Sequence, residues 1–325
     1  MALYLDYPSW IKPEVVSFLP VRWYAVMYLV AFAITYLLFK YQIKDDKTIK
    51  LNKDETTDLF MYIIVGLLLV AHLFSKLFYS DGWYYITHPW LIFWPFYNGH
   101  FVGLPGMSYH GGVVGAAIGC YIYCKKKKLS FFKITDYLSI GIPFAYTFGR
   151  LGNFINAELY GRATTSPLGM LFPNATGFDT KYTWVQEIAD KLNIEYTLGQ
   201  MVNLPRHASQ LYEAIFEGIV LGAIMWFIVR KYRKNMADGS CLAIYIFGYG
   251  FFRFIIEYFR QPDANIGYVI GDKSSNIAIF ESIWNISKGQ IFCAIMMAGG
   301  ILLFIILNKG AKNAKHKWKS ISTKR

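Results

Sequence analysis

Charged and amide side chains stand at the end of one strongly apolar segment. The stretch GRLGNFINAELYGR, residues 149–162, follows the apolar run LSIGIPFAYTF and carries Arg150, Asn153, Asn156 and Glu158. Guanidinium and amide groups donate hydrogen bonds that suit phosphate and other oxyanions. The stretch therefore predicts an oxyanion-binding site. An ion pair between Arg150 and Glu158 is the purely structural alternative.

A second stretch, YGFFRFIIEYFRQPDANIG, carries a charged stripe through an apolar sequence. Tyr249, Arg253, Glu257 and Arg260 follow one another at helical spacing, so they share one helix face. The residues between them are mostly Phe and Ile, which suit lipid. The stripe therefore predicts a helix whose polar face lines a cavity or contacts neighbouring helices. A structural ion pair of Arg253 with Glu257 is again the alternative.

Three further stretches bring polar groups to the ends of apolar segments. His110 lies in GMSYHGGVVG, where a loop enters a glycine-rich segment, and it is a candidate proton acceptor or a structural histidine. Tyr24 lies in RWYAVMY, near the start of the first apolar run. The stretch RHASQLYEAIFEG adds Glu213 and Glu217 at the start of another run.

The elements that must position these groups are membrane helices. The chain has 325 residues, of which 55% are hydrophobic and 18% aromatic, and a soluble domain is rarely so apolar. A membrane helix needs about 20 apolar residues. About seven such runs are present: 21–39, 58–79, 110–124, 134–156, 210–229, 241–259 and 290–308. We therefore predict an all-α polytopic membrane protein with about seven transmembrane helices.

The distribution of basic residues predicts the orientation. Loops that would lie on one side of the membrane, together with the tail, hold 21 Lys and Arg, and the other side holds 8. Cytoplasmic loops are enriched in these residues, so the N-terminus is predicted outside and the C-terminus inside. The net charge of +12 is thus a topology signal, and we expect no nucleic-acid partner.

The chain organisation follows from this topology. Residues 1–309 are predicted to form a membrane-embedded catalytic domain, and residues 310–325 a basic cytoplasmic tail. Residues 163–209 are polar and are predicted to form a small extracytoplasmic head, with a short amphipathic helix near 184–192. The four cysteines fall within or beside predicted spans, and we interpret them as small buried residues.

Arginines inside membrane spans usually mark a function, because a central arginine costs about 2.5–3.5 kcal/mol on insertion. Arg150 and Arg253 lie deep in predicted spans, toward the outer leaflet. The oxyanion available at that depth is the phosphate of a phospholipid headgroup. The residues therefore predict a membrane protein that handles phospholipids, without specifying the reaction.

The motifs closely resemble those of the bacterial prolipoprotein diacylglyceryl transferase family. The similar blocks are RWYAVMYLVAF, GMSYHGG, GRLGNFINAELYGR, GMLFP, RHASQLYEA and YGFFRFIIEYFRQPD, in that order. They cover most of the chain except 174–203 and the tail after 309. Where many members have an arginine, this chain has His72.

The resemblance implies a reaction and its partners. The sn-1,2-diacylglyceryl group of phosphatidylglycerol would pass to the lipobox cysteine of a prolipoprotein signal peptide, forming a thioether and releasing glycerol phosphate. No metal or other cofactor is implied, and the location would be the bacterial cytoplasmic (inner) membrane. Arg150, Arg253, His110 and Glu257 would be catalytic. Residues that would bind substrate are Tyr24, Asn153, Asn156, Glu158, Gly161, Tyr249 and Arg260.

Two other classes of protein are alternatives to this family. A CDP-alcohol phosphotransferase needs clustered aspartates for a divalent metal, and no DxxDG pattern is present. A phospholipid or anion transporter could use Arg150 and Arg253 as a phosphate site, but it needs a passage open to both sides. The polar residues gather toward one side, which favours an enzyme.

Overall fold

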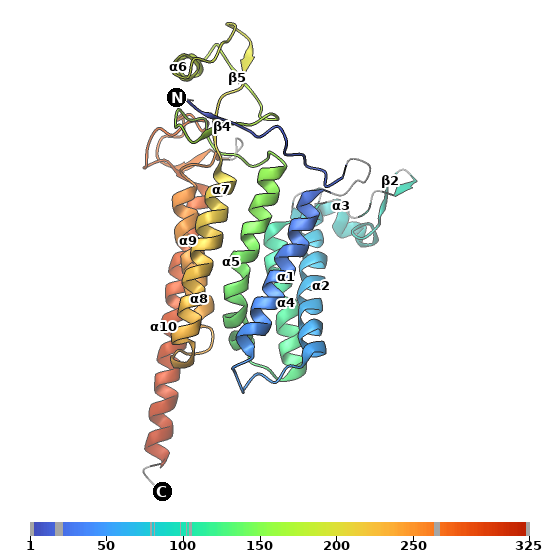
Figure 1. The fold of residues 1–325 in the computed structure, drawn as a ribbon. Coiled ribbons are helices and arrows are strands. Elements are labelled where there is room, and N and C mark those ends of the chain that lie inside the picture. Colours follow the sequence, from blue (N-terminus) through green and yellow to red (C-terminus); the bar gives the residue numbers. More distant parts are fainter. Residues whose placement is uncertain are drawn as a thin grey trace. The chain divides into compact units, whose positions relative to one another are not determined.

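Helices make up most of this computed structural model (Figure 1). It describes residues 3–16, 22–78, 80, 82–97, 99–101, 103, 106–262 and 267–322, without the side chains of 97, 109 and 311–322. Parts of three predicted segments lie outside the described residues: residue 21, where the first run begins, residue 79, where the second run ends, and residues 323–325 of the tail.

Most of each predicted apolar run falls in a helix, and residues 156 and 257–259, at the ends of two runs, lie in the turns that follow. The long helices are α1 (Trp23–Ile43), α2 (Lys53–Phe78), α4 (Tyr109–Lys127), α5 (Phe131–Ile155), α9 (Ser240–Ile256) and α10 (Lys288–Ser322). One further run is a continuous rod of α7 (Ser209–Glu213), the π-helix η2 (Ala214–Val220), α8 (Leu221–Tyr232) and the 3₁₀ turn η3 (Arg233–Asn235). Short helical pieces are α3 (Gly82–Thr87), η1 (Pro89–Leu91) and α6 (Thr183–Lys191).

Several of these helices are long enough to cross a membrane. Within the described residues, four segments are long and apolar enough to cross a membrane: Trp23–Ile43, Lys53–Phe78, Ser209–Asn235 and Lys288–Gly310. Ser240–Ile256 is a shorter apolar helix. The prediction of a mostly helical protein with several apolar spans is confirmed at this level.

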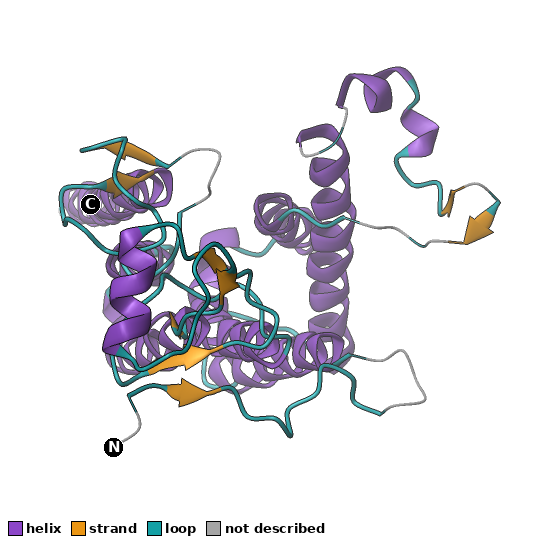
Figure 2. Cartoon of the chain, turned by 90° about the horizontal axis from the view of Figure 1, so that it is seen from above, coloured by secondary structure: helices purple, strands orange, loops and turns teal. Residues whose placement is uncertain are grey.

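Short strands, which the all-α prediction did not include, lie in the segments that connect the helices (Figure 2). β1 (Leu5–Asp6) pairs parallel with β4 (Gly169–Leu171), which pairs antiparallel with β7 (Arg206–His207). Antiparallel pairs are formed by β2 (Phe96–Tyr97) with β3 (His100–Phe101), β5 (Phe178–Asp179) with β6 (Met201–Val202), and β8 (Tyr268–Ile270) with β9 (Ile286–Ser287). Strands of two or three residues are too short to show an alternating sequence pattern.

The chain forms two compact units. The first unit comprises Met1–Phe39 and Asp136–Arg325, and the second comprises Lys40–Thr135. The first therefore holds α6 to α10 and most of α1 and α5. The second holds α2, α3 and α4.

Glycines allow α2 and α4 of the second unit to pack closely. A Cβ atom on Gly115 would lie 2.1 Å from the carbonyl oxygen of Gly66, so the two backbones meet at this point. Gly111 and Gly119 precede and follow Gly115 by four residues on the same face of α4. This small-residue stripe is typical of helix pairs inside membranes, where close backbone approach replaces hydrophobic attraction.

Gly115→Ala is expected to destabilise the protein by about 1–3 kcal/mol, because the added methyl group would overlap the α2 backbone. Gly112→Ala is the matched control, since its Cβ would meet no atom closer than 3.6 Å. Thermal unfolding of the two purified variants in detergent measures the difference. Equal unfolding temperatures for Gly115→Ala and wild type would contradict this account of the packing.

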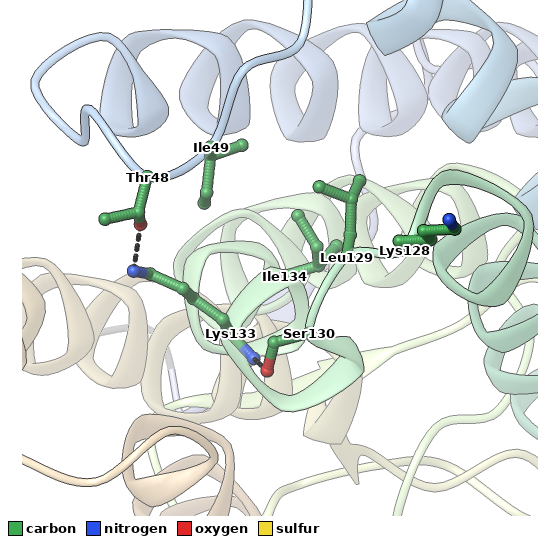
Figure 3. A pocket seen from close by; sticks show the side chains of 7 residues that line it. All are labelled: Thr48, Ile49, Lys128, Leu129, Ser130, Lys133 and Ile134. Atoms are coloured by element: carbon green, nitrogen blue, oxygen red, sulfur yellow. Dashed lines mark hydrogen bonds between the residues drawn. The ribbon is translucent and has the colours of Figure 1, made fainter.

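A small pocket lies at the turn between α4 and α5 (Figure 3). Its volume is about 200 Å³, and it is lined by Thr48, Ile49, Lys128, Leu129, Ser130, Lys133 and Ile134. The Lys133 ammonium is directed at the Thr48 hydroxyl and lies 3.2 Å from Oδ2 of Asp46. The ammonium is therefore already satisfied by the protein itself.

A buried carboxylate of the first unit holds the beginning of α9. The oxygens of Asp136 accept hydrogen bonds from the backbone N–H of Gly239 at 2.8 Å and of Leu242 at 2.9 Å. Nε of Arg233 lies 2.9 Å from the same carboxylate. Since the first N–H groups of a helix have no intrahelical partner, Asp136 supplies one from α5. This contact connects α5 to α9, the helices that carry Arg150 and Arg253.

Residues of the predicted head pack around a small core. Val185 and Ala189 of α6 are buried together with Ala163, Val202 and Leu204. The amphipathic helix predicted near 184–192 is confirmed as α6. Arg206 of β7 lies between the rings of Tyr160 and Phe178, at 5.1 and 4.1 Å from their centroids. Burial lowers the pKa of Arg206 to about 10, still high enough to keep the guanidinium charged at neutral pH.

Candidate active site

Three helical segments of the first unit supply the charged groups. Arg150 lies near the end of α5, Glu213 ends α7, and Arg253 lies in the last turn of α9. Arg260 follows directly after the turn that ends α9. The chain leaves α5 through two residues with left-handed backbone, Ala157 (φ 52°) and Leu159 (φ 57°), which redirect it at the site.

Glu213 joins all three arginines. Its side chain is fully buried, and its Oε2 atom lies 2.8 Å from Nε of Arg150 and 2.7 Å from Nη1 of Arg253. The hydroxyl of Tyr146 donates to the same oxygen at 3.0 Å. Oε1 accepts a hydrogen bond from Nη1 of Arg260 at 2.5 Å. One carboxylate therefore holds three guanidinium groups together.

Glu257 is a second carboxylate between two of these arginines. Its Oε2 atom lies 3.3 Å from Nη2 of Arg253 and 3.7 Å from Nε of Arg260. Its Oε1 atom accepts a hydrogen bond from the Ser287 hydroxyl at 3.1 Å. The structural alternative for this helix, a pair of Arg253 with Glu257, is thus present, and it helps to hold the guanidinium in place.

Amide groups extend the site along the end of α5. Nη1 of Arg150 donates to Oδ1 of Asn153 at 3.1 Å, and Nδ2 of Asn153 donates to Oε1 of Glu158 at 2.9 Å. Nδ2 of Asn156 lies 3.3 Å from the same Glu158 oxygen. The expected alternative, a direct ion pair of Arg150 with Glu158, is replaced by this relay, because Arg150 pairs with Glu213 instead.

Gly161 positions the backbone beside Arg260. It forms an antiparallel bridge with Arg260, and its N–H donates to the carbonyl of His207 at 2.8 Å. A Cβ atom at Gly161 would lie 2.1 Å from the carbonyl oxygen of Phe259, so no side chain fits. Burial lowers the pKa of His207 to about 4, and its ring is therefore neutral.

The two predicted tyrosines occupy different places in the first unit. The ring of Tyr249 lies 5.7 Å from that of Tyr146, whose other contacts are with Arg150 at 4.6 Å and with Glu213. The Tyr24 ring packs against Gly152 of α5, and its hydroxyl lies 3.1 Å from that of Tyr28.

His110 is the second residue of α4 and belongs to the second unit. Its side chain is exposed. The role expected for it as a proton acceptor is therefore still a prediction from the sequence.

Glu213, Glu217 and Tyr146 are members of the site that the sequence analysis did not assign. Glu213 and Glu217 are fully buried, although acidic side chains are almost never buried unless paired. Their four-residue spacing at the start of an apolar run was a usable signal. Nothing in the local sequence distinguishes Tyr146 from other tyrosines of the spans.

The arrangement suits an oxyanion that carries one charge or more. Each guanidinium has five N–H donors, and the carboxylate contacts engage only some of them. The arginine side chains are 16–20% exposed, so donors can reach a ligand. Across the described ranges no group of three or more His, Cys, Asp or Glu could hold a metal ion. The charges available to a ligand here are those of the arginines.

Comparisons with known proteins agree over almost the whole chain. A sequence model of the family described as prolipoprotein diacylglyceryl transferase matches residues 13–306. A phosphatidylglycerol–prolipoprotein diacylglyceryl transferase of Treponema denticola is 47% identical over 98% of this chain and 98% of its own length. Proteins of the same name from Treponema pallidum (45%, covering 92% and 94%) and Chlorobaculum tepidum (40%, covering 94% and 93%) are also similar.

Proposed function

The chain belongs to the prolipoprotein diacylglyceryl transferase family. We propose that the site formed by Arg150, Arg253 and Arg260 performs the diacylglyceryl transfer. The chain is a transferase that moves the diacylglyceryl group from phosphatidylglycerol to prolipoproteins. The observation that carries the site assignment is the sharing of one Glu213 oxygen by Arg150 and Arg253. Two guanidinium groups from different helices are thereby held where one phosphodiester can meet both.

The proposed mechanism is a displacement at carbon. The acceptor is the thiol of the lipobox cysteine in the prolipoprotein signal peptide, and its thiolate is the reactive form. The sulfur electron pair forms a bond to the glyceryl carbon as the carbon–oxygen bond to phosphate breaks. Negative charge builds on the departing glycerol phosphate. Arg150 and Arg253 stabilise that charge, and buried hydrogen-bond donors do so more strongly than water can.

The other predicted residues are assigned supporting roles in this proposal. Asn153 and Glu158 orient Arg150 through their hydrogen bonds, and Glu257 orients Arg253. Arg260 completes the phosphate site through Glu213. His110 is the proposed acceptor of the thiol proton. Tyr24, Asn156, Gly161 and Tyr249 shape the substrate-binding surface.

We also propose the membrane arrangement that the sequence predicts. About seven spans cross the bacterial cytoplasmic membrane, with the N-terminus outside and the C-terminus inside. Residues 1–309 form the catalytic domain with the 163–209 head outside, and residues 310–325 form a basic cytoplasmic tail. The basic residues bind anionic lipid headgroups rather than nucleic acid. The comparisons give no support to the transporter alternative.

Detergent-solubilised protein is expected to convert phosphatidylglycerol and a lipobox peptide to a thioether-linked diacylglyceryl peptide. Mass spectrometry of the peptide and detection of glycerol phosphate measure the two products. A peptide with serine in place of the lipobox cysteine is the control and should stay unmodified, because a hydroxyl is a far weaker nucleophile at neutral pH. Lack of product with the cysteine peptide would refute the proposed reaction.

A further inference from the structure

Glu217 is a buried acidic residue that the proposed mechanism leaves without a role. Its side chain is fully buried, and among the described residues no hydrogen bond of standard geometry reaches either of its carboxylate oxygens. The nearby Tyr146 hydroxyl, which interacts with Glu217, donates its hydrogen bond to Glu213 instead. Nη1 of Arg253 lies 3.8 Å from its Oε1 atom, but only 2.7 Å from Glu213. An ionised carboxylate that is buried with only such distant donors costs several kcal/mol. Glu217 avoids that cost if it keeps its proton.

The balance of charge in the site also favours a protonated Glu217. Arg150, Arg253 and Arg260 carry three positive charges, and Glu213 and Glu257 carry two negative charges. One positive charge is left to match the single negative charge of a phosphodiester. An ionised Glu217 would cancel that charge and leave the occupied site net negative, which a low-dielectric environment disfavours. The Glu158 side chain is exposed, so solvent screens its charge.

The helix around Glu217 is irregular. Glu217 lies in the π-helix Ala214–Val220, directly after Glu213 at the end of α7. A π-helical turn is rare, and where it occurs it often lies at a functional site. Here it places Glu217 on the side of Glu213 and Arg253. Other ionisable groups that act on Glu217 are Tyr146 and Arg150 of α5, Arg253 of α9 and Cys293 of α10.

We propose that Glu217 is uncharged in the resting enzyme and donates its proton to the glycerol phosphate that leaves during the transfer. This rests on the proposed function. The carbon–oxygen bond breaks with its electron pair on the phosphate oxygen, the phosphate takes the Glu217 proton, and Glu217 becomes a carboxylate. The thiol proton, removed by the base, restores the proton of Glu217 before the next cycle. Glycerol phosphate therefore leaves as a monoanion, which the arginines release more readily than a dianion.

Glu217→Gln tests the proton donation with the full-length protein in detergent. The side chain keeps its shape and stays neutral, but it has no acidic proton. Turnover with phosphatidylglycerol is expected to fall about 100-fold, the usual contribution of a general acid. A phosphatidylglycerol analogue with sulfur in place of the bridging oxygen leaves as a thiophosphate, which needs no proton. With this analogue the variant is expected to stay within about threefold of wild type, because acid catalysis is then unnecessary.

Binding distinguishes a neutral Glu217 from an ionised one. Phosphatidylglycerol affinity should be the same in Glu217→Gln and wild type, since no charge is removed. Glu217→Asp keeps the acid on a shorter side chain, and its turnover should lie between those of Glu217→Gln and wild type. Glu187→Gln, an exposed change on α6, is the matched control and should be fully active.

Three outcomes would overturn the role of Glu217. The first is unchanged turnover of Glu217→Gln with phosphatidylglycerol, and the second is an equal loss of turnover with phosphatidylglycerol and its sulfur analogue. The third is tenfold tighter lipid binding by Glu217→Gln, which corresponds to about 1.4 kcal/mol of relieved repulsion. A wild-type protein without activity toward either lipid would instead refute the proposed function.

Discussion

Arg253→Ala is expected to lower the turnover of diacylglyceryl transfer by about 10³-fold, because it removes the main donors to the charge that develops on the departing phosphate. Arg150→Ala is expected to have an effect of the same order, because both guanidinium groups meet one Glu213 oxygen. The measurement is the initial rate of thioether formation by purified variants in detergent, with phosphatidylglycerol and a lipobox peptide.

The arginine variants should still fold and enter the membrane. Removal of one arginine leaves Glu213 in contact with the other two, so the carboxylate remains compensated. Arg253→Lys should restore little activity, since an ammonium cannot reproduce the planar fork of a guanidinium. Arg230→Ala, an exposed change at the end of α8, is the matched control and should be fully active. Full activity of Arg150→Ala or Arg253→Ala would refute the phosphate-binding role.

Glu213→Gln is expected to destabilise the protein by about 3–5 kcal/mol, because three guanidinium groups lose the carboxylate that compensates them. Its activity should also fall steeply, since the arginines would separate by mutual repulsion. Thermal or denaturant unfolding in detergent measures the stability, alongside the transfer rate.

The stability of the variants distinguishes loss of an arginine from loss of Glu213. Arg253→Ala should lose activity with a small change in stability, whereas Glu213→Gln should lose both. Glu281→Gln, an exposed change between α9 and α10, controls for the loss of one negative charge. A Glu213→Gln variant with wild-type stability would mean that Glu213 does not hold the arginines together.

Local patterns in the sequence were sufficient for the helices and for one of the two ion pairs that the sequence suggested. Apolar runs of membrane-spanning length identify the long helices, because length and hydropathy are local properties. The pair of Arg253 with Glu257 follows from helical spacing alone, because residues four apart lie on one face. The two arginine motifs themselves are legible in the sequence, since a charge in an apolar run is conspicuous.

Only the tertiary structure identified the partner that makes the site. Glu213 lies far from Arg150, Arg253 and Arg260 along the chain, and which helix faces meet depends on packing that no local pattern encodes. For the same reason the sequence suggested Glu158 as the partner of Arg150, whereas a nearer carboxylate comes from another helix. The π-helix around Glu217 was also invisible, because its sequence is as apolar as that of an ordinary membrane helix. The charged residues were thus evident from composition, but their contacts were decided by the packing of α5, α7 and α9.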